Sequence, residues 1–394
     1  MRLRLHSMIA VLSAILLLPT LARTQEPPTA AAPVPQTQAS PAEGQAPSEE
    51  KTPEGPIEPV MSGPYPVMSS AAEERGRQLF QMFNHTETGD MWAALSDSLK
   101  KRSGKQERFA EVNKKLREHI GPETSMIEET IVPSLITPDT IYGRLSHFAN
   151  LQTPVVTMIN VNQHGQIDGF DIHPLQRIAE GRYAGYADTT KLHLPFEGEW
   201  LVYQGGRTAF NNPYAVSDDT RFSVDFINLK NGRAFSGAGG VGSKNEDYYC
   251  FGQPILAPAD GTVVRAIEGY DDNPPGQPSG DPADGNMVII SHITGERSVF
   301  THLKQNSLRV KRDDQVKQGE VIAECGNSGG GPVPHVHYQL QKSPGVGLPA
   351  QFVDYIADGK PVASGEPKRG QLVKNAPAPA AAAAAPAESP TPAK

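Results

Sequence analysis

The sequence predicts two folded domains of different class, an α+β domain followed by an all-β antiparallel domain. The chain has 394 residues, more than a single hydrophobic core usually needs. Apolar residues at helical spacing occur only in the earlier part of the folded sequence, whereas the later part contains short apolar runs separated by Gly, Pro, Asn and Asp. Gly (37 residues) and Pro (36 residues) are abundant, which indicates unfolded stretches beside the two cores.

Residues 1–22 have the pattern of a secretory signal peptide. Arg2 and Arg4 precede an apolar run, Met8–Leu18, and Thr20-Leu21-Ala22 then offers small residues for cleavage. The run is too short to span a bilayer. We therefore expect export to the periplasm or the outside of the cell, with membrane contact only through an uncleaved signal.

Two segments are expected to be disordered, the linker 23–68 and the tail 375–394. Both are rich in Pro and Ala and lack apolar periodicity. Such segments bury too little surface to offset the conformational entropy lost on folding.

Residues 69–185 are expected to form the α+β domain. Two strands, Pro154–Val161 and Gln166–Ile172, flank the turn Asn162-Gln163-His164-Gly165, in which Gly can adopt a positive φ. Helices ahead of a final hairpin resemble the cone-shaped SnoaL-like fold in the order of their elements. Amphipathic helices are predicted by Leu79, Phe80, Met82, Phe83, Trp92 and Leu95, and by Phe109, Val112, Leu116 and Ile120. Surface or core roles are expected for the scattered histidines His85, His119, His147, His164 and His173.

Residues 190–366 are expected to form the all-β domain. Its clearest strands are Met287–Ser291, Val299–Leu303, Val321–Glu324 and His335–Gln341. The last of them follows a Gly-rich loop and begins with His-x-His. Because residues two apart on a strand project from the same face, His335 and His337 should point at one site.

This region resembles the lysostaphin-like (LytM-type) zinc metalloendopeptidases. The resemblance rests on motifs in the family's order: Phe251–Pro254, Ala257–Val263, Gly285–Ile290, Thr301–Leu303, Val316–Ile322 and Gly326–Tyr338. It implies a barrel or sandwich fold, a zinc cofactor and peptidoglycan peptides as substrate. In the family, zinc is held by a His, an Asp four residues later and the second His of His-x-His.

The resemblance assigns Asp225 and His337 as zinc ligands. His302 and His335 match two further histidines that polarise the attacking water and stabilise the oxyanion. Three protein ligands leave zinc an open position for a water, whose pKa falls to about 7. Asn327 and Tyr338 are expected to be structural.

The first zinc ligand is missing. Arg221 stands four residues before Asp225, and a guanidinium cannot coordinate zinc. Some relatives place the His upstream, after a Gly-Gly turn, but the matching stretch here is Asn211-Asn212-Pro213-Tyr214. Candidate substitute ligands are Asn212, Asp218, Asp219 and His193. We expect zinc binding to be weak.

Two functions remain open. One is an active zinc endopeptidase that cuts peptidoglycan peptides. The other is a degenerate peptidase that binds cell-wall peptides or regulates a partner wall hydrolase. A purely structural module is disfavoured because it has no need for three convergent imidazoles. The formal net charge of −8 gives no reason to expect a nucleic-acid partner.

Cys250 and Cys325 are the chain's two cysteines, and either a disulfide or two buried thiols is compatible with the sequence. Each lies beside a motif of the family that the region resembles. We therefore expect them on neighbouring strands, close enough to bond.

Overall fold

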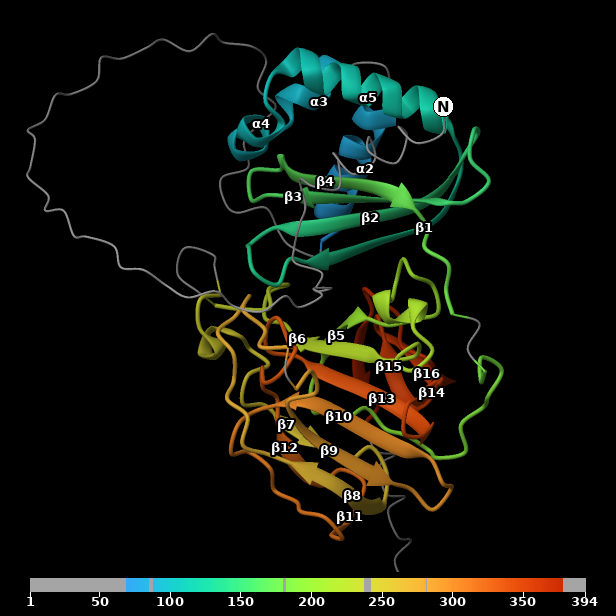
Figure 1. Cartoon of the computed structure of the whole chain (residues 1–394), viewed down its shortest axis with the longest axis vertical. Coiled ribbons are helices and arrows are strands. Elements are labelled where there is room, and N and C mark those ends of the chain that lie inside the picture. The colour runs from blue at the N-terminus through green and yellow to red at the C-terminus, as the bar shows by residue number, and fades with distance from the viewer. Residues whose placement is uncertain (1–68, 85–87, 180–181, 237–241, 281, 378–394) are drawn as a thin grey trace, which may run out of the picture.

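The computed structural model describes residues 69–84, 88–179, 182–236, 242–280 and 282–377 (Figure 1). The predicted signal peptide, the linker, His85 and most of the predicted tail lie outside these residues. Within the described part of the chain, no helix is both long and apolar enough to cross a membrane.

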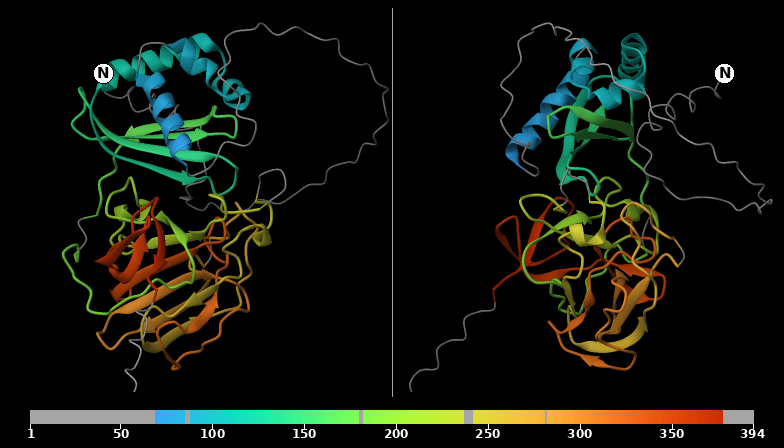
Figure 2. Two further views of the ribbon diagram at one scale, coloured as in Figure 1. Left: turned by 180° about the vertical axis from the view of Figure 1, so that it is seen from behind. Right: turned by 90° about the vertical axis from the view of Figure 1, so that its left-hand side faces the viewer.

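The first part of the chain is an α+β unit. Its helices are α2 (Ser70–Asn84), α3 (Thr88–Ala93), α4 (Asp97–Ser103) and α5 (Gln106–Ile120). They cover one face of an antiparallel sheet of order β1-β2-β3-β4, as Figures 1 and 2 show. The strands are β1 (Glu123–Pro133), β2 (Thr140–Phe148), β3 (Val155–Val161) and β4 (Ile167–Pro174). The predicted helices and the hairpin are present, and Gly165 has the positive φ, 71°.

Sequence patterns indicated only two of these four strands. β1 is the missed edge strand, and most of its first half is exposed to solvent, so it has no alternation of apolar residues to detect. β2 pairs with it along nearly its whole length. The unit is therefore a four-stranded sheet rather than a hairpin beneath helices.

The second part is all-β and antiparallel, as predicted. Its main sheet has the order β11-β8-β9-β10-β13-β6-β5-β17-β15-β16, with β14 paired to β13, and a second sheet pairs β12 with β7. Since the described strand order has two ends, the sheet is open rather than a closed barrel. The strands are β5 (Trp200–Gln204), β6 (Val224–Asn228), β7 (Pro254–Leu256), β8 (Gly261–Ile267), β9 (Asn286–Ser291), β10 (Arg297–Leu303), β11 (Gln315–Val316), β12 (Val321–Glu324), β13 (Val336–Ser343), β14 (Val346–Leu348), β15 (Phe352–Ala357), β16 (Lys360–Gly365) and β17 (Leu372–Asn375).

The sheet extends beyond residue 366. β17 pairs with β5 and β15, and Asn375 is its last residue. The Asn375 side chain donates to the carbonyls of Leu194 and Phe196, at 3.0 Å each. Asn375 is thus part of the folded sheet.

A disulfide joins Cys250 and Cys325, with Cα atoms 5.9 Å apart. The first cysteine lies just before β7 and the second just after β12, and these two strands pair. Of the two alternatives, a disulfide or two buried thiols, the structure therefore contains the disulfide. The disulfide links the start of the Gly-rich loop, just after β12, to the segment that leads into β7.

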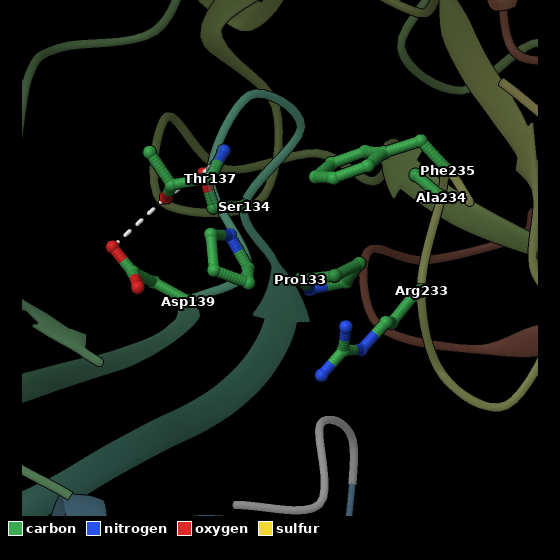
Figure 3. A pocket seen from close by; sticks show the side chains of 8 residues that line it. Pro133, Ser134, Thr137, Asp139, Arg233, Ala234 and Phe235 are labelled. Atoms are coloured by element: carbon green, nitrogen blue, oxygen red, sulfur yellow. Dashed lines mark hydrogen bonds between the residues drawn. The ribbon is translucent and has the colours of Figure 1, made fainter. Parts of the chain in front are cut away.

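The two parts pack directly against each other. One apolar cluster joins Val132 of β1 to Leu201 and Ile227, and another joins Leu145 and Val156 to Phe210. A small pocket lies at this junction (Figure 3). Thr137 Oγ1 donates to Asp139 there at 2.8 Å, and burial raises the pKa of the Asp139 carboxyl. The pocket is lined by Pro133, Ser134, Thr137, Pro138, Asp139, Arg233, Ala234 and Phe235.

Candidate active site

Strand register places Asp225 beside His337 in the middle of the main sheet. β13 lies between β6 and β10, and His337 is the Cα partner of Asp225 on one side and of Thr301 on the other. His337 Nδ1 and Asp225 Oδ1 are 2.8 Å apart. Both side chains are buried, at 7% and 5% exposure.

The other two histidines reach the same place from irregular backbone. His302 has a φ of 60°, at a register irregularity between β10 and β9, and its Nδ1 lies 2.9 Å from the Ser328 carbonyl. His335 Nδ1 lies 2.7 Å from the Val333 carbonyl. The ring centroids of His302 are 5.0 Å from His335 and 5.7 Å from His337. Asp225, His302, His335 and His337 thus converge, as the His-x-His strand and the order of the family motifs predict.

Tyr214 is a member of the site that sequence reasoning missed. It lies in the short 3-10 helix η1 (Pro213–Val216), which Asn212 caps by accepting from Tyr214 N at 3.1 Å. The Tyr214 hydroxyl donates to Asp225 Oδ2 at 3.0 Å, and its ring stands edge-on to His337, 5.1 Å between centroids. The Tyr214 hydroxyl therefore holds the Asp225 carboxylate. Tyr214 lies in the stretch where some relatives carry the first zinc ligand.

Arg221 does not face the carboxylate. Its buried guanidinium donates to the carbonyl oxygens of Ala179 and Ala215. Burial lowers the pKa of this group below its ordinary value. Arg221 is thus a structural cation that is turned toward backbone carbonyl groups.

The candidate substitute ligands do not join the cluster. Asn212 Nδ2 donates to three carbonyls, at 3.0–3.3 Å, while its Oδ1 caps η1, so its amide is fully used. Asp218 and Asp219 are exposed, and His193 is half-buried beside Pro258, to whose carbonyl its backbone N–H donates. Among the described residues, the group of potential ligands close enough for one metal is His302, His335 and His337.

Charge in the site favours an ionised Asp225 and a neutral His302. Burial alone would raise the pKa of Asp225, but the nearby His335 and the hydrogen bonds from His337 and Tyr214 lower it below the ordinary value. Burial, and then the neighbouring His335 and His337, lower the pKa of His302 well below its usual range. Burial beside Asp225 raises the pKa of Tyr214, so its hydroxyl stays a donor.

The Gly-rich loop lies directly over the imidazoles. A Cβ at Gly331 would stand 3.3 Å from His335 Cε1 and 3.4 Å from His302 Cγ. Asn327 holds the loop by donating to Asn245 Oδ1 and the Asn273 carbonyl, at 3.1 and 3.0 Å. A side chain at position 331 would enter the site.

The residues present do not fit the His-Asp-His zinc set. Two members of that set are side by side, since His337 Nδ1 and Asp225 Oδ1 lie 2.8 Å apart. The third member of the set is replaced by the protonated hydroxyl of Tyr214, which already donates to Asp225.

Comparison with known proteins supplies the family. Residues 244–351 match the model of peptidase family M23. The chain is 31% identical to lipoprotein NlpD of Yersinia enterocolitica over 93 residues, which cover 23% of this chain and 78% of NlpD. The chain belongs to peptidase family M23.

Other curated relatives are matched over a smaller part of their length. Cell division protein DipM of Caulobacter vibrioides is 32% identical over 121 residues, 30% of this chain and 18% of DipM. Peptidoglycan DD-endopeptidase ShyA of Vibrio cholerae is 28% identical over 118 residues, 30% of this chain and 23% of ShyA. The chain spans only 16–30% of the length of the first three relatives.

Proposed function

We propose that this chain is an exported M23 protein that binds the peptide part of peptidoglycan at the site around His302, His335 and His337, with little or no peptidase activity. The relative named a peptidoglycan DD-endopeptidase supports the ligand class. The signal-peptide pattern of residues 1–22 supports export to the periplasm or cell exterior.

One observation carries the proposal of low activity: the Tyr214 hydroxyl donates to Asp225 Oδ2 at 3.0 Å. Asp225 Oδ2 thus has a tyrosine hydroxyl as its partner rather than a third ligating side chain, and Asp225 Oδ1 lies 2.8 Å from His337 Nδ1. Within the part of the chain that the structure describes, no third family ligand stands beside them. A peptide-binding role uses the site without needing that ligand.

The experiment measures binding and cleavage of soluble muropeptides by the purified full chain. We expect binding without cleavage at neutral pH. Gly331→Val should weaken binding because its side chain would enter the space beside His335 and His302. Gly185→Val is the matched control, since the position of its Cβ has open space around it. Cleavage by the wild type that is lost in His337→Ala would refute the proposal.

A second candidate function is an active metallopeptidase, favoured by the convergence of three imidazoles. The variant Tyr214→His distinguishes this candidate from the first, because it restores an imidazole beside Asp225. If only this variant cleaves muropeptides, the chain has kept the peptide-binding site and lost one ligand. If the wild type cleaves equally well, the enzyme assignment holds. Regulation of a partner wall hydrolase stays an alternative use of the same site.

A further inference from the structure

A cluster of positive charges lies where α4 ends and α5 begins. Residues 97–108 contain five cationic side chains and two acidic ones, a formal charge of +3 in a chain whose formal net charge is −8. Gly104, with a φ of 84°, turns the chain between the two helices. The last turn of α4 and the first turn of α5 thus bring five cations to one place, which we call the basic corner: Lys100, Lys101, Arg102, Lys105 and Arg108.

Two cations of the basic corner have acidic partners. Lys100 Nζ lies 4.0 Å from Asp97 Oδ1. Arg102 Nη2 lies 3.8 Å from Asp168 Oδ2. The other three are exposed, and within the described part of the chain they form no ion pair or side-chain hydrogen bond: Lys101, Lys105 and Arg108. Their charges are therefore available to an external anion.

Helix stability does not explain the two cations of the basic corner that α5 supplies. A helix N-terminus carries a partial positive charge, so cations are unfavourable in the first turn of a helix. Lys105 is the N-cap residue of α5 and makes no side-chain cap hydrogen bond, and Arg108 lies in the first turn. These two residues break a local rule without a gain in the fold, which is expected of residues with a function.

The basic corner is remote from the all-β part of the molecule. α4 and α5 lie in the helical layer, on the opposite side of the β1–β4 sheet from the all-β part (Figures 1 and 2). An extended surface fits this corner better than a small ligand does, because small-ligand sites are concave and mostly apolar with a few convergent polar groups. The three unpaired cations come instead from exposed helix ends.

We propose that the basic corner binds the anionic headgroups of a phospholipid membrane through Lys101, Lys105 and Arg108. Clusters of lysine and arginine on a helical surface are attracted to an anionic leaflet. The signal-peptide pattern of residues 1–22 indicates passage through a membrane, and the predicted linker 23–68 is long enough for the α+β unit to lie on its surface. The inference goes beyond the proposed function, which concerns the histidine site.

The test is co-sedimentation of the purified full chain with vesicles of phosphatidylglycerol and phosphatidylcholine, compared with vesicles of phosphatidylcholine alone. We expect binding to the mixed vesicles that falls steeply between about 0.1 and 1 M salt, where the screening length falls from about 10 Å to 3 Å. The triple variant Lys101→Gln, Lys105→Gln, Arg108→Gln should bind these vesicles about 100-fold more weakly, since each cation near an anionic leaflet contributes about fivefold.

A matched control lowers the net charge by the same amount in the all-β part. It replaces three exposed cations, Lys311→Gln, Arg312→Gln and Lys360→Gln, and should bind like the wild type. All three proteins keep residues 1–68, so any contact of that segment with the vesicles is common to them. Circular dichroism confirms that the variants are folded, which is expected because the replaced side chains are exposed and Gln has a helix propensity close to that of Lys.

Three results would overturn the inference. They are equal binding of the wild type to both kinds of vesicle, equal binding by the wild type and the basic-corner variant, or an equal loss in the matched control. Binding of the wild type to purified peptidoglycan in place of vesicles, lost in the basic-corner variant, would also overturn it, because the partner would then be a wall polymer. The vesicles contain no muropeptide, so failure of this test leaves the proposed function standing, and the reverse also holds.

Discussion

Removing one oxygen atom from Tyr214 tests whether this residue holds the Asp225 carboxylate. In Tyr214→Phe the ring keeps its edge-on contact with His337, but Asp225 Oδ2 loses the donor that lies 3.0 Å away. Asp225 is only 5% exposed, so water cannot readily replace that donor. Leaving a buried acceptor unsatisfied costs about 1–3 kcal/mol. We expect the free energy of unfolding to fall by that amount at pH 7.

The loss should depend on pH, and its sign follows from Asp225. The folded-state pKa of Asp225 lies below its ordinary value. Its ionised form therefore stabilises the fold above about pH 3.9, and this contribution is lost as pH falls toward the folded-state pKa. Since the Tyr214 hydroxyl acts on the ionised form, the difference between wild type and Tyr214→Phe should shrink as the pH is lowered through 4.

The assay is urea unfolding of both proteins from pH 8 down to the lowest pH at which both still fold, so that the range extends below the ordinary pKa of Asp225. Tyr270→Phe is the matched control, because Tyr270 is 40% exposed, and a surface change of this kind stays within about 0.5 kcal/mol. A double-mutant cycle with Asp225→Asn isolates the interaction between the two side chains. A Tyr214→Phe effect no larger than the control, or equal at every pH, would show that the reasoning is wrong.

Three further predictions concern the framework around the site. Asp188→Asn should stabilise the protein at pH 8 and not at pH 4, as measured by urea unfolding. Burial raises the pKa of Asp188 to about 6, so ionisation of this carboxyl destabilises the fold as pH rises from about 4 to 6. Because Asp188 is partly exposed to solvent, the gain in the free energy of unfolding should be about 1 kcal/mol. Replacing both Cys250 and Cys325 by Ser should lower stability by about 2–4 kcal/mol, since the disulfide closes a loop with a sequence separation of 75, and equal unfolding midpoints would contradict this. Gly326→Ala should lower the thermal midpoint strongly because its Cβ would overlap the Lys304 backbone, whereas Gly185→Ala, with open space around its Cβ, should not.

Local patterns in the sequence were enough to predict the part of the site built on regular strands. The His-x-His spacing placed His335 and His337 on one face, and Gly at the hairpin turn fixed the β3–β4 connection. These features depend on residues close together in the chain. The edge strand β1 was missed because most of the side chains in its first half are exposed and show no apolar alternation.

Tyr214 could not be predicted because its role depends on how the chain folds back between η1 and β6. Its hydroxyl meets Asp225, 11 residues further along the chain, through this irregular segment. A single tyrosine in a segment without strand or helix periodicity also gives no signal of its own. The useful signal would have been its position, since it lies in the stretch where some relatives carry the missing imidazole. The left-handed backbone of His302 was equally invisible, because β10 otherwise has an ordinary strand pattern.

The N-terminal sheet contributes to the site through the segment that carries Tyr214. Asn211 donates to both oxygens of Glu128 in β1, at 2.9 and 3.0 Å. Phe210, its neighbour in the chain, packs in the cluster with Leu145 and Val156 of the same sheet. The next residue, Asn212, caps the turn that aims Tyr214 at Asp225. Three consecutive residues thus connect the α+β unit to the carboxylate, because the segment that contacts β1 runs directly into the turn that carries Tyr214.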